Sequence, residues 1–411
     1  MARRVAITGI GPVTPIGIGA EDLWRGVRAE RSAVRRIERF DASAFSCQIA
    51  AEVRDFRPEE IFDARRLRRL DRFAQFSLAA AQLALRDAGL EITDANRECV
   101  GVYIGSALGG VAYAEEQHRA YLAGGIRGVS PALALAVYAG AGASNVAIDL
   151  GVTGPASGNA NSCASGAMAI GEALRAIRSG EANAAIAGGV EAPLAPLTFG
   201  AFALIKAMST RNECPERASS PFDVDRDGFV MAEGAALLVL EDLESAERRG
   251  ARIYCELLGY GTTNDAYHMT APLPSGAQAA RAVRLALRAA GITPAELDYI
   301  NAHGSATELN DKTETLVFRT AIGDAAEHVP ISGTKGMHGH ALGASGAFEA
   351  AICALVLERG WLPPTVNLCT PDPACDLDYI RAEGRAVRPR YLLSTSFGFG
   401  GVNAALVLGQ P

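Results

Sequence analysis

Short apolar runs that contain or end at glycine recur along the 411-residue chain, and they constrain its fold more than any other feature. This pattern is typical of strands that are covered on both faces. The predicted strands are residues 4–9, 100–106 and 184–189. Residues 73–88 and 164–179 are predicted helices that end at glycine, and a glycine and proline turn is predicted at residues 9–12. The sequence therefore predicts an α/β protein.

Two pairs of segments resemble each other across the chain. The pairs are residues 227–240 with 397–408, and residues 5–9 with 299–304. Such a repeat predicts two α/β halves, residues 1–250 and 251–411. Chance similarity between strands rich in glycine and alanine is the alternative, and the pattern alone does not decide between the two.

Composition excludes several classes of protein. Hydrophobic residues make up 49% and charged residues 21% of the chain, as in soluble globular proteins. A net charge of −7 argues against general nucleic-acid binding, which requires a basic surface. The sequence shows neither a signal peptide nor an apolar run of about 18 residues that would span a membrane. Eight scattered cysteines without metal-type spacing predict a cytoplasmic protein with reduced thiols and no bound metal.

Three distant segments each place a reactive side chain beside glycine or other small residues. The first contains Cys163, directly before the predicted helix at residues 164–179. The positive end of a helix dipole favours a thiolate, and nearby N–H groups can bind a developing oxyanion. A small buried core thiol is the alternative for a lone cysteine.

The other two segments contain His303 and His340. His303 follows a predicted strand, from which it can project into a site or simply satisfy a backbone hydrogen bond. Small residues around His340 let backbone and substrate approach closely. His338 could form a metal pair with it, but no cysteine or carboxylate spacing completes a metal set. One thiol and two imidazoles suit covalent acyl transfer followed by carbon–carbon bond formation.

Lys335 and Glu349 are separated by fourteen positions, which does not establish that they pair. If buried together, they would fix the loop that holds His340. Four arginines fall on one face of a possible helix, and these are Arg65, Arg68, Arg69 and Arg72. Such a row of arginines is usually a solvent-exposed helix face. In a chain of negative net charge, it could instead bind an acidic partner.

Taken together, these segments resemble the β-ketoacyl-[acyl-carrier-protein] synthases. The resemblance is strongest to the elongating type II enzymes of fatty-acid synthesis and to the ketosynthase α subunits of type II polyketide synthases. It covers nearly the whole chain and is specific because many short motifs occur in the same order. The matching motifs are residues 8–11, 162–166, 209–212, 225–230, 265–270, 301–304, 339–343 and 396–401.

The resemblance implies a thiolase-like fold, in which two similar halves form a five-layered αβαβα core. It also implies a dimer, with substrates carried on the phosphopantetheine of acyl-carrier protein and no bound cofactor. Cys163 resembles the nucleophile that accepts the acyl chain. His303 and His340 resemble the pair that hydrogen-bonds the malonyl thioester and stabilises the enolate formed when CO₂ leaves.

Further roles follow from the same resemblance. Lys335 and Glu349 are similar to a supporting ion pair, and Glu314 with Asp311 to a structural site. Phe399 resembles a gate between the two half-reactions, and its backbone N–H would form the oxyanion hole with that of Cys163. The expected acyl pocket contains Leu108, Ala132, Leu133 and Ala134. The expected docking patch for the acidic carrier contains Arg65, Arg68, Arg69, Arg127 and Lys206.

The sequence departs from the fatty-acid enzymes at four positions. These are Ala306, Asn310, Gly336 and His338. Residues 301–311 and 231–236 favour the polyketide branch, but both branches share the chemistry, so a housekeeping fatty-acid synthase remains an alternative. Chain length, pathway and the choice between a homodimer and a heterodimer stay open.

Three other functions are less consistent with the residues. A thiolase needs a second cysteine near the C-terminal glycine loop, and residues 394–403 contain none. Starter-condensing ketosynthases carry asparagine where this chain has His340. Chain-length factors, which are non-catalytic partner subunits, normally lack the nucleophile that Cys163 provides.

Overall fold

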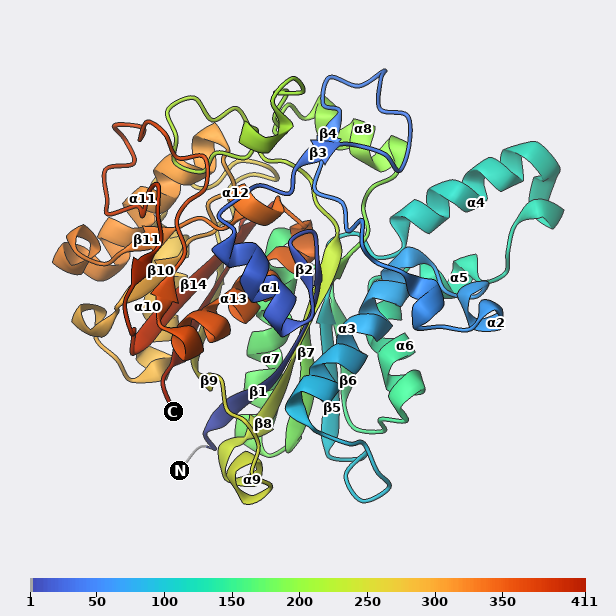
Figure 1. The fold of residues 1–411 in the computed structure, drawn as a ribbon, viewed down its shortest axis with the longest axis horizontal. Coiled ribbons are helices and arrows are strands. Elements are labelled where there is room, and N and C mark those ends of the chain that lie inside the picture. The colour runs from blue at the N-terminus through green and yellow to red at the C-terminus, as the bar shows by residue number, and fades with distance from the viewer. Residues whose placement is uncertain (1–2) are drawn as a thin grey trace.

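A mixed sheet of 11 strands runs through the molecule in a computed structural model that describes residues 3–411 (Figure 1). Its strands follow the order β11-β10-β14-β15-β9-β1-β8-β7-β5-β6, with β2 beside β1. The strands are β1 (Val5–Thr14), β2 (Gly17–Ile18), β5 (Val100–Gly105), β6 (Ala156–Asn159), β7 (Ala184–Glu191), β8 (Gly234–Asp242), β9 (Cys255–Asn264), β10 (Tyr299–Asn301), β11 (Ile331–Ser332), β14 (Tyr391–Gly398) and β15 (Val402–Gly409). Two short sheets lie outside it, β3 (Arg35–Arg36) with β4 (Ile49–Ala50), and β12 (Trp361–Leu362) with β13 (Arg385–Ala386).

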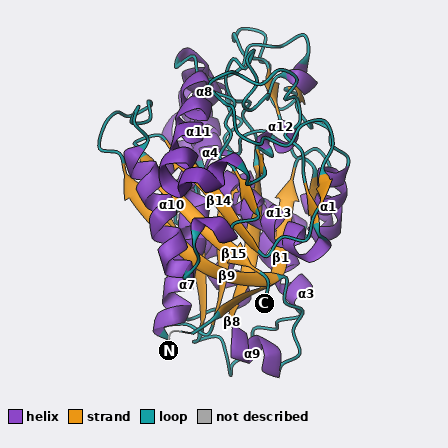
Figure 2. Cartoon of the chain, turned by 90° about the vertical axis from the view of Figure 1, so that its left-hand side faces the viewer, coloured by secondary structure: helices purple, strands orange, loops and turns teal. Residues whose placement is uncertain are grey.

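The sheet has two parts, β11-β10-β14-β15-β9 and β1-β8-β7-β5-β6. Helices cover its faces and lie between the two parts (Figures 1 and 2). The helices are α1 (Ala20–Arg28), α2 (Ala64–Leu67), α3 (Arg72–Ala88), α4 (Val111–Gly124), α5 (Leu133–Ala136), α6 (Ala141–Leu150), α7 (Ser165–Ser179), α8 (Pro196–Leu204), α9 (Leu243–Arg248), α10 (Ala277–Ala290), α11 (Glu308–Ile322), α12 (Lys335–His338) and α13 (Ser345–Arg359). Helices α7 and α13 contact strands of both parts, whereas α3 packs on β1 and β8, and α10 on β9 and β15. The resulting layers are those of the predicted thiolase-like fold.

The strand order is symmetrical about the junction of β1 and β9, which pair only through Ala6 and Ile7. Counting outward from that junction, β8 occupies the same position as β15, and β7 the same position as β14. The predicted similarity of residues 227–240 to 397–408 therefore corresponds to equivalent strands. The similarity of residues 5–9 to 299–304 does not correspond to equivalent strands, because β1 is equivalent to β9 and β10 to β5. This symmetry supports a division at about residue 250, which we propose as the boundary of the halves.

The predicted helices and two of the three predicted strands are confirmed within a few residues. The prediction of a turn at residues 9–12 is wrong, because β1 continues to Thr14. Glycine has another role there. A Cβ on Gly9 would lie 2.3 Å from the carbonyl oxygen of Ala84, and a Cβ on Gly11 would lie 2.0 Å from that of Ala80. The two glycines let α3 pack directly against the strand backbone.

No helix within residues 3–411 is long and apolar enough to cross a membrane.

The close approach of α3 to β1 gives a stability prediction. Gly11→Ala forces a Cβ into the α3 backbone, so the melting temperature should fall by about 2 °C or more in thermal unfolding followed by circular dichroism. Gly124→Ala is the matched control, because a Cβ there meets nothing within 4 Å. Equal melting temperatures for the two variants would contradict the packing that we describe.

Candidate active site

Cys163 lies in a tight turn between β6 and α7. Ser162 adopts a left-handed conformation with φ of 52°, and its carbonyl accepts a hydrogen bond of 2.6 Å from the hydroxyl of Ser165 at the start of α7. The turn holds the thiol at the N-terminal end of the helix, with 7% of the residue exposed. The backbone therefore fixes the position of Cys163. Because the thiol is buried, a substrate reaches it through the cavity that it lines.

The second half repeats this turn at α13. Leu342 has φ of 43°, and α13 begins at Ser345. The two helices cross where small residues meet: a Cβ on Gly166 would lie 3.2 Å from Cβ of Ala347, and a Cβ on Gly346 would lie 2.9 Å from Cβ of Ala167. This contact brings the segments before the two helices, with Cys163 and His340, to the same cavity.

His303 and His340 face each other, with ring centroids 5.3 Å apart. The Nζ atom of Lys335 lies 3.3 Å from Nδ1 of His303 and also donates hydrogen bonds to the His303 carbonyl and to Glu349. An ammonium group can only donate, so Nδ1 of His303 accepts and Nε2 carries the proton. The sequence left the Lys335–Glu349 pair open, and the structure forms it as a fully buried ion pair.

His340 is oriented by its neighbour across the turn. Its Nδ1 lies 2.8 Å from the hydroxyl of Ser345, which can donate to it and so leave the proton on Nε2. Burial, together with the positive charge of Lys335, holds the pKa of both His303 and His340 well below the ordinary value. Both rings are therefore neutral near pH 7 and present N–H donors.

The backbone of the His303 loop is held by a buried carboxylate. Glu314 accepts hydrogen bonds from the N–H groups of His303 (2.7 Å) and Gly304 (2.8 Å), and from the hydroxyl of Thr395 (2.8 Å). Asp311 accepts a hydrogen bond of 2.7 Å from the N–H of Phe222. Burial raises the pKa of Glu314 to about 7, although these donors oppose that rise. Glu314 thus holds the His303 loop, Asp311 holds the segment of Phe222, and neither carboxylate lines the cavity.

A loop between β14 and β15 lies over Cys163. The N–H of Phe399 is directed at the Cys163 thiol, and its ring stacks on Phe202 with centroids 6.4 Å apart. The loop is tied to the segment that follows β9, because Gly400 donates to the Met269 carbonyl at 2.7 Å and Asn403 donates to the Asp265 carboxylate at 2.8 Å. Phe399 therefore lines the cavity beside Cys163, and its role as a gate stays a prediction.

The cavity beside these groups has a volume of about 370 Å³. Cys163, His303, His340 and Phe399 all line it, and Lys206, Glu308 and Leu309 line it as well. Leu108, Ala132, Leu133 and Ala134 do not line it, although Leu108 packs against the core cluster that contains Cys163. The four predicted pocket residues stay a prediction about the acyl end of the site.

Burial has the largest effect on the pKa of the Cys163 thiol. It raises the pKa of Cys163 to about 11, against the lowering effects of Ser162, Lys335 and the Phe399 N–H. The sequence predicted a favoured thiolate from the helix dipole, and burial acts in the opposite direction because it disfavours the charged form.

The predicted arginine stripe does not lie on one helix, because Arg65 is in α2, Arg68 and Arg69 follow it, and Arg72 begins α3. Arg65, Arg68 and Arg69 are exposed, as are Arg127 and Lys206. Arg72 starts the separate helix α3, where Asp71 caps the N-terminus, and its guanidinium pairs with buried Glu233. Arg72 is therefore a structural residue and does not belong to an exposed patch.

His338 and Glu191 add two buried groups near the site. His338 lies 3.2 Å from the Thr334 hydroxyl and packs on Phe348, and burial lowers its pKa to about 3. Within residues 3–411 no three His, Cys, Asp or Glu side chains are grouped as metal ligands, so the His338–His340 pair is not part of a metal centre of that size. Glu191 was missed by the sequence analysis, although a carboxylate that ends the apolar run of β7 is a signal of a buried polar role.

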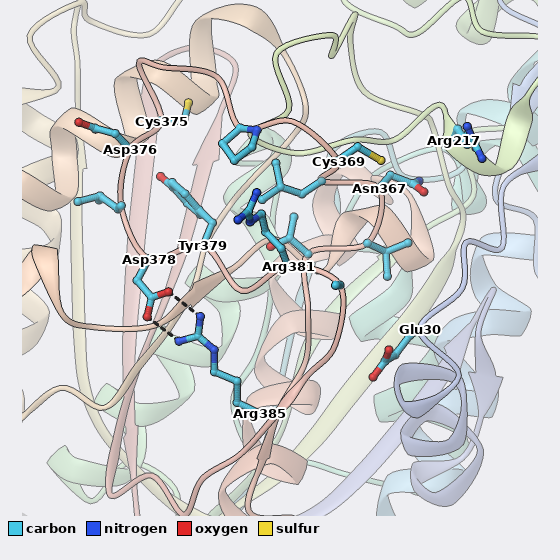
Figure 3. A pocket seen from close by; sticks show the side chains of 16 residues that line it. Glu30, Arg217, Asn367, Cys369, Cys375, Asp376, Asp378, Tyr379, Arg381 and Arg385 are labelled. Atoms are coloured by element: carbon cyan, nitrogen blue, oxygen red, sulfur yellow. Dashed lines mark hydrogen bonds and ion pairs between the residues drawn. The ribbon is translucent and has the colours of Figure 1, made fainter.

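A second cavity of about 920 Å³ lies between the loop 365–385 and residues of the N-terminal half (Figure 3). Residues of the loop 365–385 form most of its wall, with Glu30 and Arg217 on the other side. Asp378 and Arg385 form a two-bonded ion pair in this wall, with both distances 2.6 Å. It shares no lining residue with the Cys163 cavity, so the chemistry that we describe is confined to the latter.

Comparison with known proteins agrees with this geometry. The family description "Beta-ketoacyl synthase, N-terminal domain" matches residues 2–246, and "Beta-ketoacyl synthase, C-terminal domain" matches residues 254–369. The chain belongs to the β-ketoacyl synthase family. It is 45% identical to 3-oxoacyl-[acyl-carrier-protein] synthase 2 of Synechocystis sp., over 98% of this chain and 97% of that protein. The protein of the same name from Coxiella burnetii is 44% identical over 99% of both chains.

Solved structures of related ketosynthases superpose on the whole chain. One is a type II polyketide acyl-carrier protein in complex with its ketosynthase bound to the hexaketide, with a TM-score of 0.92, 36% identity and full coverage of both chains. Another is the ishigamide ketosynthase/chain length factor, with a TM-score of 0.93, 37% identity and full coverage of both chains. These similarities establish a thiolase-like ketosynthase fold and a condensing acyltransferase.

The raised pKa of Cys163 gives a pH prediction. The thiolate is the reactive form, so alkylation of Cys163 by iodoacetamide should accelerate about tenfold per pH unit between about pH 7 and 9. Peptide mass spectrometry would follow Cys163, with exposed Cys99 as the reagent reference in the same sample. A rate that levels off below about pH 8 would contradict the raised pKa.

Proposed function

We propose that the protein transfers an acyl chain from acyl-carrier protein to Cys163 and condenses it with malonyl-acyl-carrier protein, with loss of CO₂. The observation that carries this proposal is a single cavity lined by a thiol and two histidines, whose Nδ1 atoms contact Lys335 and Ser345 and so leave Nε2 to donate. Acyl transfer needs the thiol, and decarboxylation needs donors for an enolate.

The first half-reaction uses Cys163 and the loop over it. The sulfur attacks the carbonyl carbon of the carrier thioester, and the N–H groups of Cys163 and Phe399 stabilise the oxyanion that forms. Gly398 supports this arrangement, because a Cβ there would lie 3.1 Å from the N atom of Cys163. The bond to the pantetheine sulfur then breaks, and that sulfur leaves with the proton that Cys163 gave up.

The second half-reaction uses the two histidines. Their Nε2–H groups donate to the carbonyl oxygen of the malonyl thioester, so the electron pair released with CO₂ is held as an enolate. Its carbon attacks the Cys163 thioester, a carbon–carbon bond forms, and the bond to sulfur breaks to return the thiolate. Neither histidine has to change its protonation state, which agrees with their lowered pKa values.

The orientation of His340 gives a prediction that separates the two half-reactions. Ser345→Ala removes the donor to Nδ1, so decarboxylation of malonyl-carrier protein should slow by roughly ten- to a hundredfold. Acylation of Cys163, followed by intact-protein mass, should change less than about twofold. Ser179→Ala at the far end of α7 is a control that removes a hydroxyl bonded only to the Ala176 carbonyl. Unchanged decarboxylation in Ser345→Ala would contradict the proposed role.

The exposed cations support docking of an acidic carrier. Lys206 lines the mouth of the cavity, and Arg65, Arg68 and Arg69 project from the segment around α2. We expect the double variant Arg68→Glu with Arg69→Glu to raise KM for the carrier substrate about tenfold, with little change in kcat. Arg281→Glu on α10 is the matched control, since Arg281 is also exposed. An equal change in KM for both variants would contradict carrier docking at Arg68 and Arg69.

We also propose a dimer, formed through the face around β6. This strand ends the sheet, and three of its four residues are exposed. Large apolar side chains are exposed on the neighbouring helices, among them Leu135 (73%) and Ile148 (82%). A second subunit would cover these groups and bring the segment of Ala132 to Ala134 close to the acyl end of the site. The partner is either a second copy or a chain-length-factor subunit.

The products distinguish these cases and test the function. The purified protein is mixed with acyl- and malonyl-carrier protein, and the masses of the carrier-bound products are measured. A single β-ketoacyl extension by the protein alone is expected for a self-sufficient homodimer. Products that appear only with a chain-length-factor subunit identify the catalytic half of a polyketide heterodimer. Absence of acyl-Cys163 in both mixtures would overturn the proposed function in favour of a non-catalytic subunit.

A further inference from the structure

Glu191 connects the two parts of the site without touching its cavity. It is the last residue of β7 and has no exposed surface. We propose that Glu191 is a positioning residue for both half-reactions, which fixes the turn at residues 106–108 relative to the segment that carries His340. This inference rests on the proposed function, because it assigns the two sides of the carboxylate to acyl binding and to decarboxylation.

The carboxylate makes four hydrogen bonds, all as acceptor. Oε1 accepts from the Ser106 hydroxyl at 3.0 Å and from the Leu108 N–H at 3.1 Å. Oε2 accepts from the Ala107 N–H at 2.7 Å and from the Gly343 N–H at 2.9 Å. Ser106 to Leu108 follow β5 in the first half, whereas Gly343 belongs to the turn before α13 in the second. One side chain therefore joins segments that are more than two hundred residues apart in sequence.

An ionised carboxylate accepts from all four partners, although burial raises the pKa of Glu191 to about 7. The Ser106 oxygen already accepts the Gly109 N–H at 2.8 Å, so its own proton is available for Glu191. An amide in place of the carboxylate would direct an NH₂ group at donors, and a neutral acid would do the same with its hydroxyl. A buried carboxylate without these hydrogen bonds would destabilise the protein. The four donors therefore stabilise the charged form of Glu191.

Close packing leaves little freedom at this junction. A Cβ on Gly343 would lie 2.4 Å from the Ala107 N atom and 2.7 Å from Oε2 of Glu191. A Cβ on Gly189, two residues before Glu191 in β7, would lie 2.6 Å from the Gly343 carbonyl oxygen. The two turns therefore touch, and a shift of one displaces the other.

The junction is connected to the reacting groups on both sides. Gly343 lies between His340 and Ser345, whose hydroxyl orients the His340 ring. Ala107 and Leu108 pack against the core cluster that contains Cys163, at the expected acyl end of the site. Loss of the carboxylate should therefore change His340 and the acyl pocket together. A buried residue that contributed only to stability would lower the amount of folded protein. It would not slow the two half-reactions in the protein that stays folded.

Two variants test this inference. Glu191→Gln keeps the shape and removes the charge, and it should slow both Cys163 acylation and malonyl decarboxylation by about tenfold or more. Ser106→Ala removes one donor on the acyl side and leaves the Gly343 bond. It should alter the dependence of acylation on chain length and keep decarboxylation within about twofold of the parent rate. Circular dichroism establishes that each variant is folded.

Hydrogen exchange supplies a readout that does not depend on the reaction. In Glu191→Gln the amides of Leu108 and Gly343 should exchange at least about tenfold faster, while amides in α10 stay unchanged. If the parent protein neither acylates Cys163 nor decarboxylates malonyl-carrier protein, the proposed function fails, and the exchange result still decides whether Glu191 holds the junction. A folded Glu191→Gln variant with parental rates and parental exchange would overturn the inference. If Glu191→Gln does not fold, equal loss of both half-reactions in Ser106→Ala would overturn it.

Discussion

The crossing of α7 and α13 determines where the reactive groups meet. Gly166 and Gly346 allow the helix backbones to approach, and each helix begins one residue after a short turn that contains a left-handed residue. One of these turns carries the thiol, and the other follows His340. A side chain at either glycine would separate the two turns. The cavity, the opposed histidines and the contact of Gly343 with β7 all depend on this approach.

Burial and the neighbouring charge of Lys335 together set the protonation state of the two histidines. Lys335 donates to His303, pairs with Glu349 and lowers the pKa of both rings together with burial. A positive charge on either ring would lie in a buried site beside another cation. The histidines therefore act as neutral donors, and the reaction that suits such donors is stabilisation of an enolate. Cys163, in the same buried place, stays a thiol until substrate is bound.

The sequence predicted the elements whose patterns are local. Helices α3 and α7 and strands β5 and β7 follow from apolar runs and terminal glycines, and motif order predicted the fold and the reactive trio. In sequence, a glycine that forms a turn cannot be distinguished from one that lets a helix pack against a strand. The extension of β1 through Gly9 and Gly11 was therefore missed. Partners that depend on tertiary contact, such as Glu191 with Gly343 and Arg72 with Glu233, could not be read from spacing.

The most direct test of the neutral-histidine site is the protonation state of His303 and His340. Nitrogen-15 chemical shifts of protein labelled at its six histidines should be recorded from about pH 5 to pH 8. Both rings are predicted to keep the shifts of the neutral form with the proton on Nε2 across this range. Titration of either ring near its ordinary pKa, or a proton on Nδ1 of His303, would contradict the role assigned to Lys335.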